Sequence, residues 1–402
     1  MTPTTEIGTL TPTTTPTRIG AHTHAPIAAL DQIGFELGWD YAHHRVCPPE
    51  AYAQAPSPLR DGLLAGQATF GLRTLNATRP VRKWLQLRLH AWLRGRSVEL
   101  VQVTPNHLAQ LEVSHCPITR TALSVATLES SDASIDRVRN DAGYAAGNLA
   151  VMSTKANHAK AGHGFRDAIQ FVKQVEAGAL GGIDGLTAAQ WARVAVLCSL
   201  VEPLDHDEAC ALPLLVLPPN RLRLFNPVQA LQAFASRQLL APGWSQRLSR
   251  FEDLLPGKPC KQAPGRSQAC LTPSGGGSLR SGGPGGDLRR DFKGFFMALL
   301  PRVLEAGKLG DQPNTRWAIE DAWRSPLVQQ RWAHFARQLN PAQCQALLVK
   351  AAARRLCGTT IEAMSDAFAT DGWNLETRGY VPHQHGGAAR APADAVQQSL
   401  AL

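Results

Sequence analysis

The sequence predicts a mainly α-helical protein with one small ββα unit inserted, and therefore an α+β chain overall. Apolar residues recur at helical spacing in a series of segments along the 402-residue chain. Two short apolar runs, 133–138 and 149–152, flank a loop with two glycines and precede a helical segment at 153–161. The 34 glycines and 28 prolines further indicate linkers between several domains.

The N-terminal part divides into a tail and a basic helical region. Residues 1–25 contain ten threonines and three prolines with few large apolar groups, so we expect a disordered tail. Residues 26–102 are expected to be helical, with helices over 62–75 and 80–95. The second begins with Pro80, which is tolerated in a first turn because its missing N–H has no helical partner there.

The ββα unit is expected within residues 103–163, after a lead helix over 105–112. Its hairpin connects the two apolar runs, and its helix carries Asn157 and Lys160 three residues apart. Residues three apart share one face of a helix, so these two side chains are expected to point the same way.

Helical patterns return in the second half of the chain. A helical region is expected over 164–255, a Gly/Pro-rich linker over 256–290, a helical C-terminal domain over 291–372 and a flexible tail over 373–402. The individual helices are predicted over 164–177, 187–201, 227–240, 243–255, 291–307, 315–339 and 341–357. Thr187 with Gln190 has the spacing of a capping box, and Asn340 is placed to cap the last helix.

Charge and cysteine content limit the class of protein. The formal charge is +9, and residues 60–173 hold 15 Lys/Arg against 8 Asp/Glu, so a polyanion such as nucleic acid is the expected partner. The absence of a long apolar run and of a signal-peptide pattern predicts a protein that neither enters a membrane nor is secreted. Eight cysteines without a Cys-x-x-Cys pair predict free thiols, no structural zinc and a cytoplasmic location.

The stretch around the hairpin carries an ordered motif. It reads Ser134-Ile135-Asp136-Arg137, then Gly143-Tyr144, then Gly147-Asn148, then Asn157-x-x-Lys160, and it follows Cys116-Pro117-Ile118-Thr119. In this order and spacing it resembles the HNH (His-Me finger) nuclease family, in a branch without the zinc knuckle. The likeness covers residues 103–163, which are called the finger below.

The resemblance implies one-metal hydrolysis of a phosphodiester bond. Asp136 and Asn157 would hold a divalent metal, Mg²⁺ or Mn²⁺, that stabilises the leaving oxygen. Asn148 would hold the hairpin loop by hydrogen bonds. Lys155 and Lys160 would meet phosphates as point charges.

One position departs from the family pattern. Arg137 stands where the general-base histidine is expected, and a guanidinium stays protonated and cannot take a proton from water. Arg137 is therefore expected to clamp a phosphate or stabilise charge. His158, His115 and Tyr144 are the alternative base candidates, and each also has an ordinary structural interpretation.

The helix predicted before the finger offers a second phosphate-binding surface. Arg82, Lys83, Arg88 and Arg94 are interleaved with Trp84 and Trp92. They fit a basic helix laid along a phosphate backbone. They equally fit an amphipathic helix whose tryptophans are core and whose arginines are solvated.

Three functions follow from these patterns. The first is a metal-dependent HNH-like endonuclease that acts on DNA rather than RNA. The second is an HNH-fold DNA-binding protein that has lost catalysis, as Arg137 suggests. The third is a mainly helical interaction protein, in which the helical regions after residue 163 bind a protein partner or a second copy of the chain.

Overall fold

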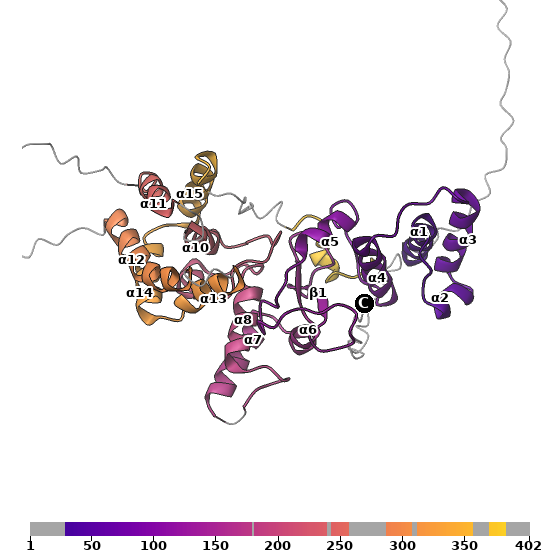
Figure 1. The fold of residues 1–402 in the computed structure, drawn as a ribbon, viewed down its shortest axis with the longest axis horizontal. Helices are drawn as coiled ribbons and strands as arrows, with labels where there is room; N and C mark the ends of the chain where they lie inside the picture. Colours follow the sequence, from indigo (N-terminus) through magenta and orange to yellow (C-terminus); the bar gives the residue numbers. More distant parts are fainter. Residues whose placement is uncertain are drawn as a thin grey trace, which may run out of the picture.

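The computed structural model describes residues 29–178, 181–238, 243–256, 287–307, 312–356 and 370–382. Within them are 15 α-helices and one two-stranded sheet, so the prediction of a mainly α, α+β chain is confirmed. Figure 1 shows an elongated arrangement, with the first helices at one end, the sheet near the middle and the last helices at the other end. The predicted N-terminal tail and most of the predicted linker lie outside the described residues. No described helix is long and apolar enough to cross a membrane.

The N-terminal helices pack closely through glycines. The elements are α1 (Ala29–His43), α2 (Glu50–Gln54), α3 (Pro58–Phe70) and α4 (Arg79–Leu93). A Cβ on Gly38 of α1 would lie 1.9 Å from the Leu59 carbonyl oxygen, and one on Gly62 of α3 would lie 1.9 Å from that of Phe35. Only glycine therefore permits this approach of the two helices.

The finger has the predicted ββα order. It comprises α5 (Pro105–Leu111), β1 (Ala133–Arg137), β2 (Leu149–Ser153) and α6 (Thr154–Lys160). The strands are antiparallel, with Ala133 opposite Ser153 and Arg137 opposite Leu149. Every residue of β2 is buried, because Leu149 and Val151 join a core with α4 and α5, whereas Ala150 and Met152 join one with α6 and α8.

The remaining helices belong to two hydrophobic cores. α7 (Phe165–Glu176) and α8 (Ala188–Ser199) share the core of α6. A second core contains residues of α9 (His206–Ala211), α10 (Pro227–Gln238), α11 (Trp244–Glu252), α12 (Leu288–Gly307), α13 (Gln312–Ala322), α14 (Pro326–Ala336) and α15 (Pro341–Ala353). The two cores therefore meet within the predicted region 164–255, with α8 in the first core and α9 in the second, and the second core includes helices on both sides of the predicted linker.

Two predicted elements differ from the structure. The single helix expected over 315–339 is two helices, α13 and α14, because Pro326 cannot continue a helix and begins a new one. Residues 373–382 were expected in a flexible tail, but Trp373 is fully buried and Leu375–Thr377 forms a 3₁₀ turn. The rest of that tail lies outside the described residues.

We call residues 370–382 the C-terminal strap because they bind two distant segments of the chain. The backbone N–H of Gly143, in the hairpin loop, donates to the Trp373 carbonyl at 2.7 Å. The N–H of Ser97 donates to Gly379 at 2.9 Å, and that of Val381 donates to Gly95 at 2.9 Å. These bonds hold the strap between the hairpin loop and the end of α4.

The five described cysteines are free thiols, and four of them are buried. Burial raises the pKa of Cys198, Cys210 and Cys344 to about 12. These thiols therefore stay protonated at neutral pH and pack as small apolar side chains.

Candidate functional site

The inward face of β1 meets α6 in two polar pairs. Ser134 and Asp136, two residues apart on the strand, both point toward the helix. Asn157 donates through Nδ2 to Ser134 Oγ at 2.7 Å. One helical turn later, Lys160 Nζ lies 2.9 Å from Asp136 Oδ2. The prediction that Asn157 and Lys160 share a face is thus confirmed.

The Asp136–Lys160 ion pair is buried within the finger. The Lys160 side chain is 0% exposed and that of Asp136 only 6%. The ammonium group donates a hydrogen bond to the Arg137 carbonyl at 3.0 Å, whereas Asp136 Oδ2 has no aligned donor, so its attraction to Lys160 is electrostatic. The charged end of Lys160 therefore lies inside the finger and does not reach the surface, where it was predicted to meet DNA phosphates.

This arrangement does not fit the divalent metal that the resemblance implies. The ammonium group of Lys160 already lies beside the carboxylate that would bind the cation, and it would repel a second positive charge there. The described residues also contain no group of three or more His, Cys, Asp or Glu side chains suited to a metal ion.

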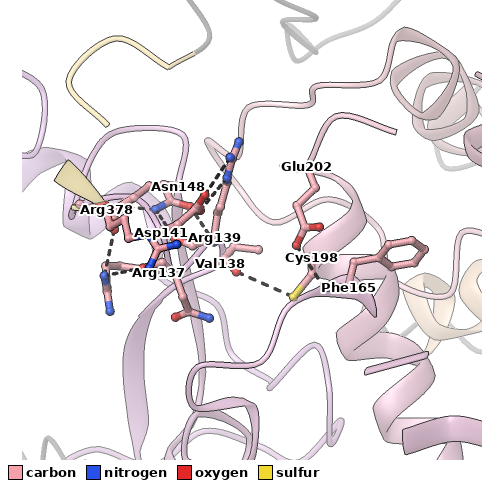
Figure 2. A network of polar contacts seen from close by, with 12 residues as sticks. Arg137, Val138, Arg139, Asp141, Asn148, Phe165, Cys198, Glu202 and Arg378 are labelled. Atoms are coloured by element: carbon pink, nitrogen blue, oxygen red, sulfur yellow. Dashed lines mark hydrogen bonds and ion pairs between the residues drawn. The ribbon is translucent and has the colours of Figure 1, made fainter. Parts of the chain in front are cut away.

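Arg137 binds the hairpin loop. Its Nη1 donates to the carbonyl oxygens of Asn140 at 3.1 Å and Ala142 at 2.9 Å, and its guanidinium lies 5.2 Å from the centre of the Tyr144 ring. The side chain thereby closes the loop that follows β1 (Figure 2). A role as a phosphate clamp would require these contacts to be broken.

Asn148 holds the same loop from inside, as predicted. Its Oδ1 accepts from the Arg139 N–H at 2.8 Å, and its Nδ2 donates to the carbonyls of Arg139 at 3.0 Å and Gly143 at 3.1 Å. The residue is fully buried. Figure 2 shows it beside Arg139, whose guanidinium forms an ion pair with Asp141 at 2.7 Å.

The three candidate bases lie in different places. His158 is on the exposed face of α6. The ring of His115 meets the edge of Trp317 in α13, with ring centres 5.3 Å apart. Tyr144 is buried against Arg137. None of the three forms a hydrogen bond or ion pair with Asp136 in the described structure, so no acid–base pair is assembled there.

The cations of α4 divide between the interior and the surface. Lys83 is buried and forms an ion pair with Glu112 at 3.3 Å; burial lowers its pKa, and Glu112 opposes that effect. Arg88 is buried, paired with Asp40, and its guanidinium lies 4.3 Å from the Trp84 ring. Both side chains thus lie in the interior, away from the surface where they were predicted to contact DNA.

A smaller set of cations remains available at the surface. Arg82 on α4 and Lys155 on α6 are exposed, whereas Arg94 at the end of α4 is half-buried. None of these three forms an ion pair with another described residue. Lys155 shares the outward face of α6 with His158, three residues away.

Sequence reasoning missed Arg120, which connects the finger to α13. Its guanidinium forms ion pairs with Asp321 at 2.7 Å and Glu320 at 3.3 Å. Glu320 is 1% exposed and also accepts from the Leu217 N–H at 2.9 Å. No local sequence pattern predicts this contact, because its partners lie about 200 residues apart in the sequence.

The strap was also missed, although its aromatic residues were a signal. Trp373 donates through Nε1 to the Ala146 carbonyl at 3.1 Å, and the Arg96 guanidinium lies 3.7 Å from the Tyr380 ring. A tryptophan in an otherwise loop-like tail favours burial, because leaving so large an apolar surface in water is unfavourable.

The finger therefore contains a hairpin, an asparagine that holds its loop and a helix, and an internal ion pair occupies the position where the resemblance implies a metal. Comparison of the chain with models of known protein families, with curated proteins and with solved structures gave no match in any of the three.

Proposed function

We propose that this protein binds DNA through the outward side of the finger and of α4, and that Asp136 does not take part in hydrolysis. The observation that carries the proposal is the buried Asp136–Lys160 pair. A ββα unit whose acid is neutralised from within keeps the shape of a nucleic-acid-binding element but has no free carboxylate for a catalytic metal.

Charge supports a polyanionic partner. Within residues 60–173, the exposed cations Arg73, Arg82, Lys155 and Lys173 form no ion pair with any described residue. Exposed cations in excess attract the phosphate backbone and release condensed counterions when they bind it. Arg82 and Lys155 lie on helices that pack on opposite faces of the same small sheet, and we assign each of them to phosphate contact on its own side.

Fluorescence anisotropy with a labelled DNA duplex tests the binding. We expect the protein to bind the duplex in the presence of EDTA, and its affinity for the duplex to fall steeply as the salt concentration rises. Replacing both cations, Arg82→Gln with Lys155→Gln, is expected to lower the slope of log affinity against log salt by about one for each lost phosphate contact. The matched control is Lys350→Gln, an exposed lysine on α15. Undetectable DNA binding would favour a helical interaction protein instead.

A plasmid-nicking assay distinguishes this proposal from the hypothesis that the protein is an endonuclease. We expect the wild-type protein to leave supercoiled plasmid intact with Mg²⁺ and with Mn²⁺. Metal-dependent nicking by the wild type that is lost in Asp136→Asn, with a native circular dichroism spectrum for the variant, would show that Asp136 is catalytic and that our proposal is wrong.

A further inference from the structure

A groove of about 900 Å³ lies between α12 and α14, far along the chain from the finger. The two helices run beside each other in the C-terminal domain (Figure 1). Arg290 of α12 lines the groove, as do Arg331 on α14 and Arg337 just after it. Neither the finger nor the proposed DNA surface accounts for this feature.

The groove carries an excess of positive charge. Its one carboxylate, Asp291, is 11% exposed and already has three partners: Arg290 Nε lies 3.7 Å from it, Gln338 Nε2 donates to it at 2.9 Å, and His334 Nε2 lies 3.4 Å from it. Arg331 and Arg337 form no ion pair with any described residue. The groove therefore attracts an anion.

One of these arginines is held in place by the backbone of α12. Arg331 Nη1 donates to the Gly294 carbonyl at 2.7 Å, at a point where the helix carries no side chain. A guanidinium has five N–H donors in a fixed plane, so this bond positions the group and leaves other donors for a ligand. Planar, paired donors of this kind suit phosphate oxygens.

The size of the groove and its apolar surface limit the class of ligand that it can bind. The groove is larger than a single phosphate requires and lies within the range of small-molecule sites. Leu327, whose side chain is 49% exposed, lines it and offers apolar contact. We propose that the α12–α14 groove binds a phosphate-bearing ligand of nucleotide size, with the phosphate on Arg331 and Arg337 and the less polar part against Leu327.

Calorimetric titration of the full chain tests this site. The probes are pyrophosphate, adenosine 5′-monophosphate and a short single-stranded oligonucleotide. We expect Arg331→Gln and Arg337→Gln each to weaken binding by about tenfold, the loss of one charge-assisted contact. Leu327→Asn is expected to weaken the nucleotide but not pyrophosphate. The control is Arg302→Gln, an exposed arginine of α12 outside the groove, and the unfolding midpoint of each variant is measured alongside.

The probes distinguish the source of the phosphate. If the groove variants lose binding of the mononucleotide, the ligand of the groove is a free nucleotide. If they lose binding of the oligonucleotide alone, the ligand is one nucleotide unit of a nucleic-acid strand. The Arg82→Gln/Lys155→Gln variant should bind the mononucleotide normally, so failure here is separable from failure of the proposed DNA surface. Absence of binding by all three probes, or equal binding by the wild type and the groove variants, would overturn the proposal.

Discussion

At the scale of single residues, the finger depends on two charges that neutralise each other out of water. Asp136 and Lys160 are both buried, and each has the other as its ion-pair partner. Removing both charges from water is costly, and their attraction offsets that cost only while both are present. The fold of the finger therefore depends on both members of this ion pair.

A double-mutant comparison tests whether the stability of the finger depends on this ion pair. Asp136→Asn and Lys160→Met are each expected to lower the free energy of unfolding by about 3 kcal/mol, because each leaves the other charge buried without its partner. The double variant Asp136→Asn/Lys160→Met is expected to lose less than the sum of the two. Urea denaturation followed by circular dichroism measures these values. Single losses below about 1 kcal/mol, or strictly additive ones, would show that the charges are solvated.

Asp132, just before β1, leads to a second prediction, which concerns the pH dependence of the protein's stability. Burial works to raise the pKa of Asp132, but hydrogen bonds from the Thr127 and Ser124 hydroxyls and from the N–H groups of Thr127 and Leu128 outweigh it. The pKa therefore lies below the ordinary value of 3.8. A lowered carboxyl pKa adds stability that is present above the unfolded-state value and is lost as pH falls through the folded-state value.

The matching variant is Asp132→Asn. The difference in free energy of unfolding between the wild type and this variant should be constant above pH 3.8, the ordinary value, and should shrink below it. Denaturant titrations across this acid range measure the difference. A difference that does not change with pH would mean that the carboxylate charge contributes nothing to the loop.

At the scale of elements, local signals predicted most helices and the hairpin. The capping box at Thr187 and the cap at Asn340 are formed as expected, because both depend on residues only three apart. Helical spacing also placed Asn157 and Lys160 on one face of α6. It did not reveal that this face points inward, because the direction depends on α8 and β1, which pack around α6. Lys160 was therefore misassigned to the surface.

The strap is one of the segments that local patterns missed, as are the helices α1, α2 and α9, and it has a direct test. Trp373→Ala is expected to lower the free energy of unfolding by about 3 kcal/mol, since it empties a fully buried site and removes the bond to Ala146. The hairpin loop 139–147 should also become sensitive to limited proteolysis. Glu376→Ala, an exposed residue of the same strap, is the control. Equal stability of the two variants would mean that the strap is not part of the fold.

At the scale of the whole molecule, formal charge overstates the cationic surface. Residues 60–173 hold 15 Lys/Arg against 8 Asp/Glu, but Lys83, Arg88 and Lys160 are buried in ion pairs. Arg120 is engaged with α13. Sequence counts cannot separate a charge that meets solvent from one that meets an acid far along the chain. The located basic surface is consequently narrower than the sequence predicted.

The same pairing links the core that contains α6 and α8 to the C-terminal core. Arg120 belongs to the finger, whereas Glu320 and Asp321 belong to α13, which packs in the C-terminal core. Nearby, the buried Arg193 donates to the Ile118 carbonyl at 2.9 Å; burial, with Arg120 and Arg324, lowers its pKa to about 10, so it stays charged at neutral pH. The junction thus holds several arginines around two carboxylates.

Arg120→Met should therefore weaken the coupling between the cores. We expect a loss of about 2 kcal/mol, because a hydrogen-bonded charge is removed from a nearly buried acid, and a single unfolding transition should separate into two. The control is Arg324→Met, a half-exposed partner of Asp321 at 3.6 Å, for which a loss below about 1 kcal/mol is expected. Calorimetry resolves the transitions. If Arg324→Met costs as much as Arg120→Met, or if the transition stays single, the cores are held together by packing alone.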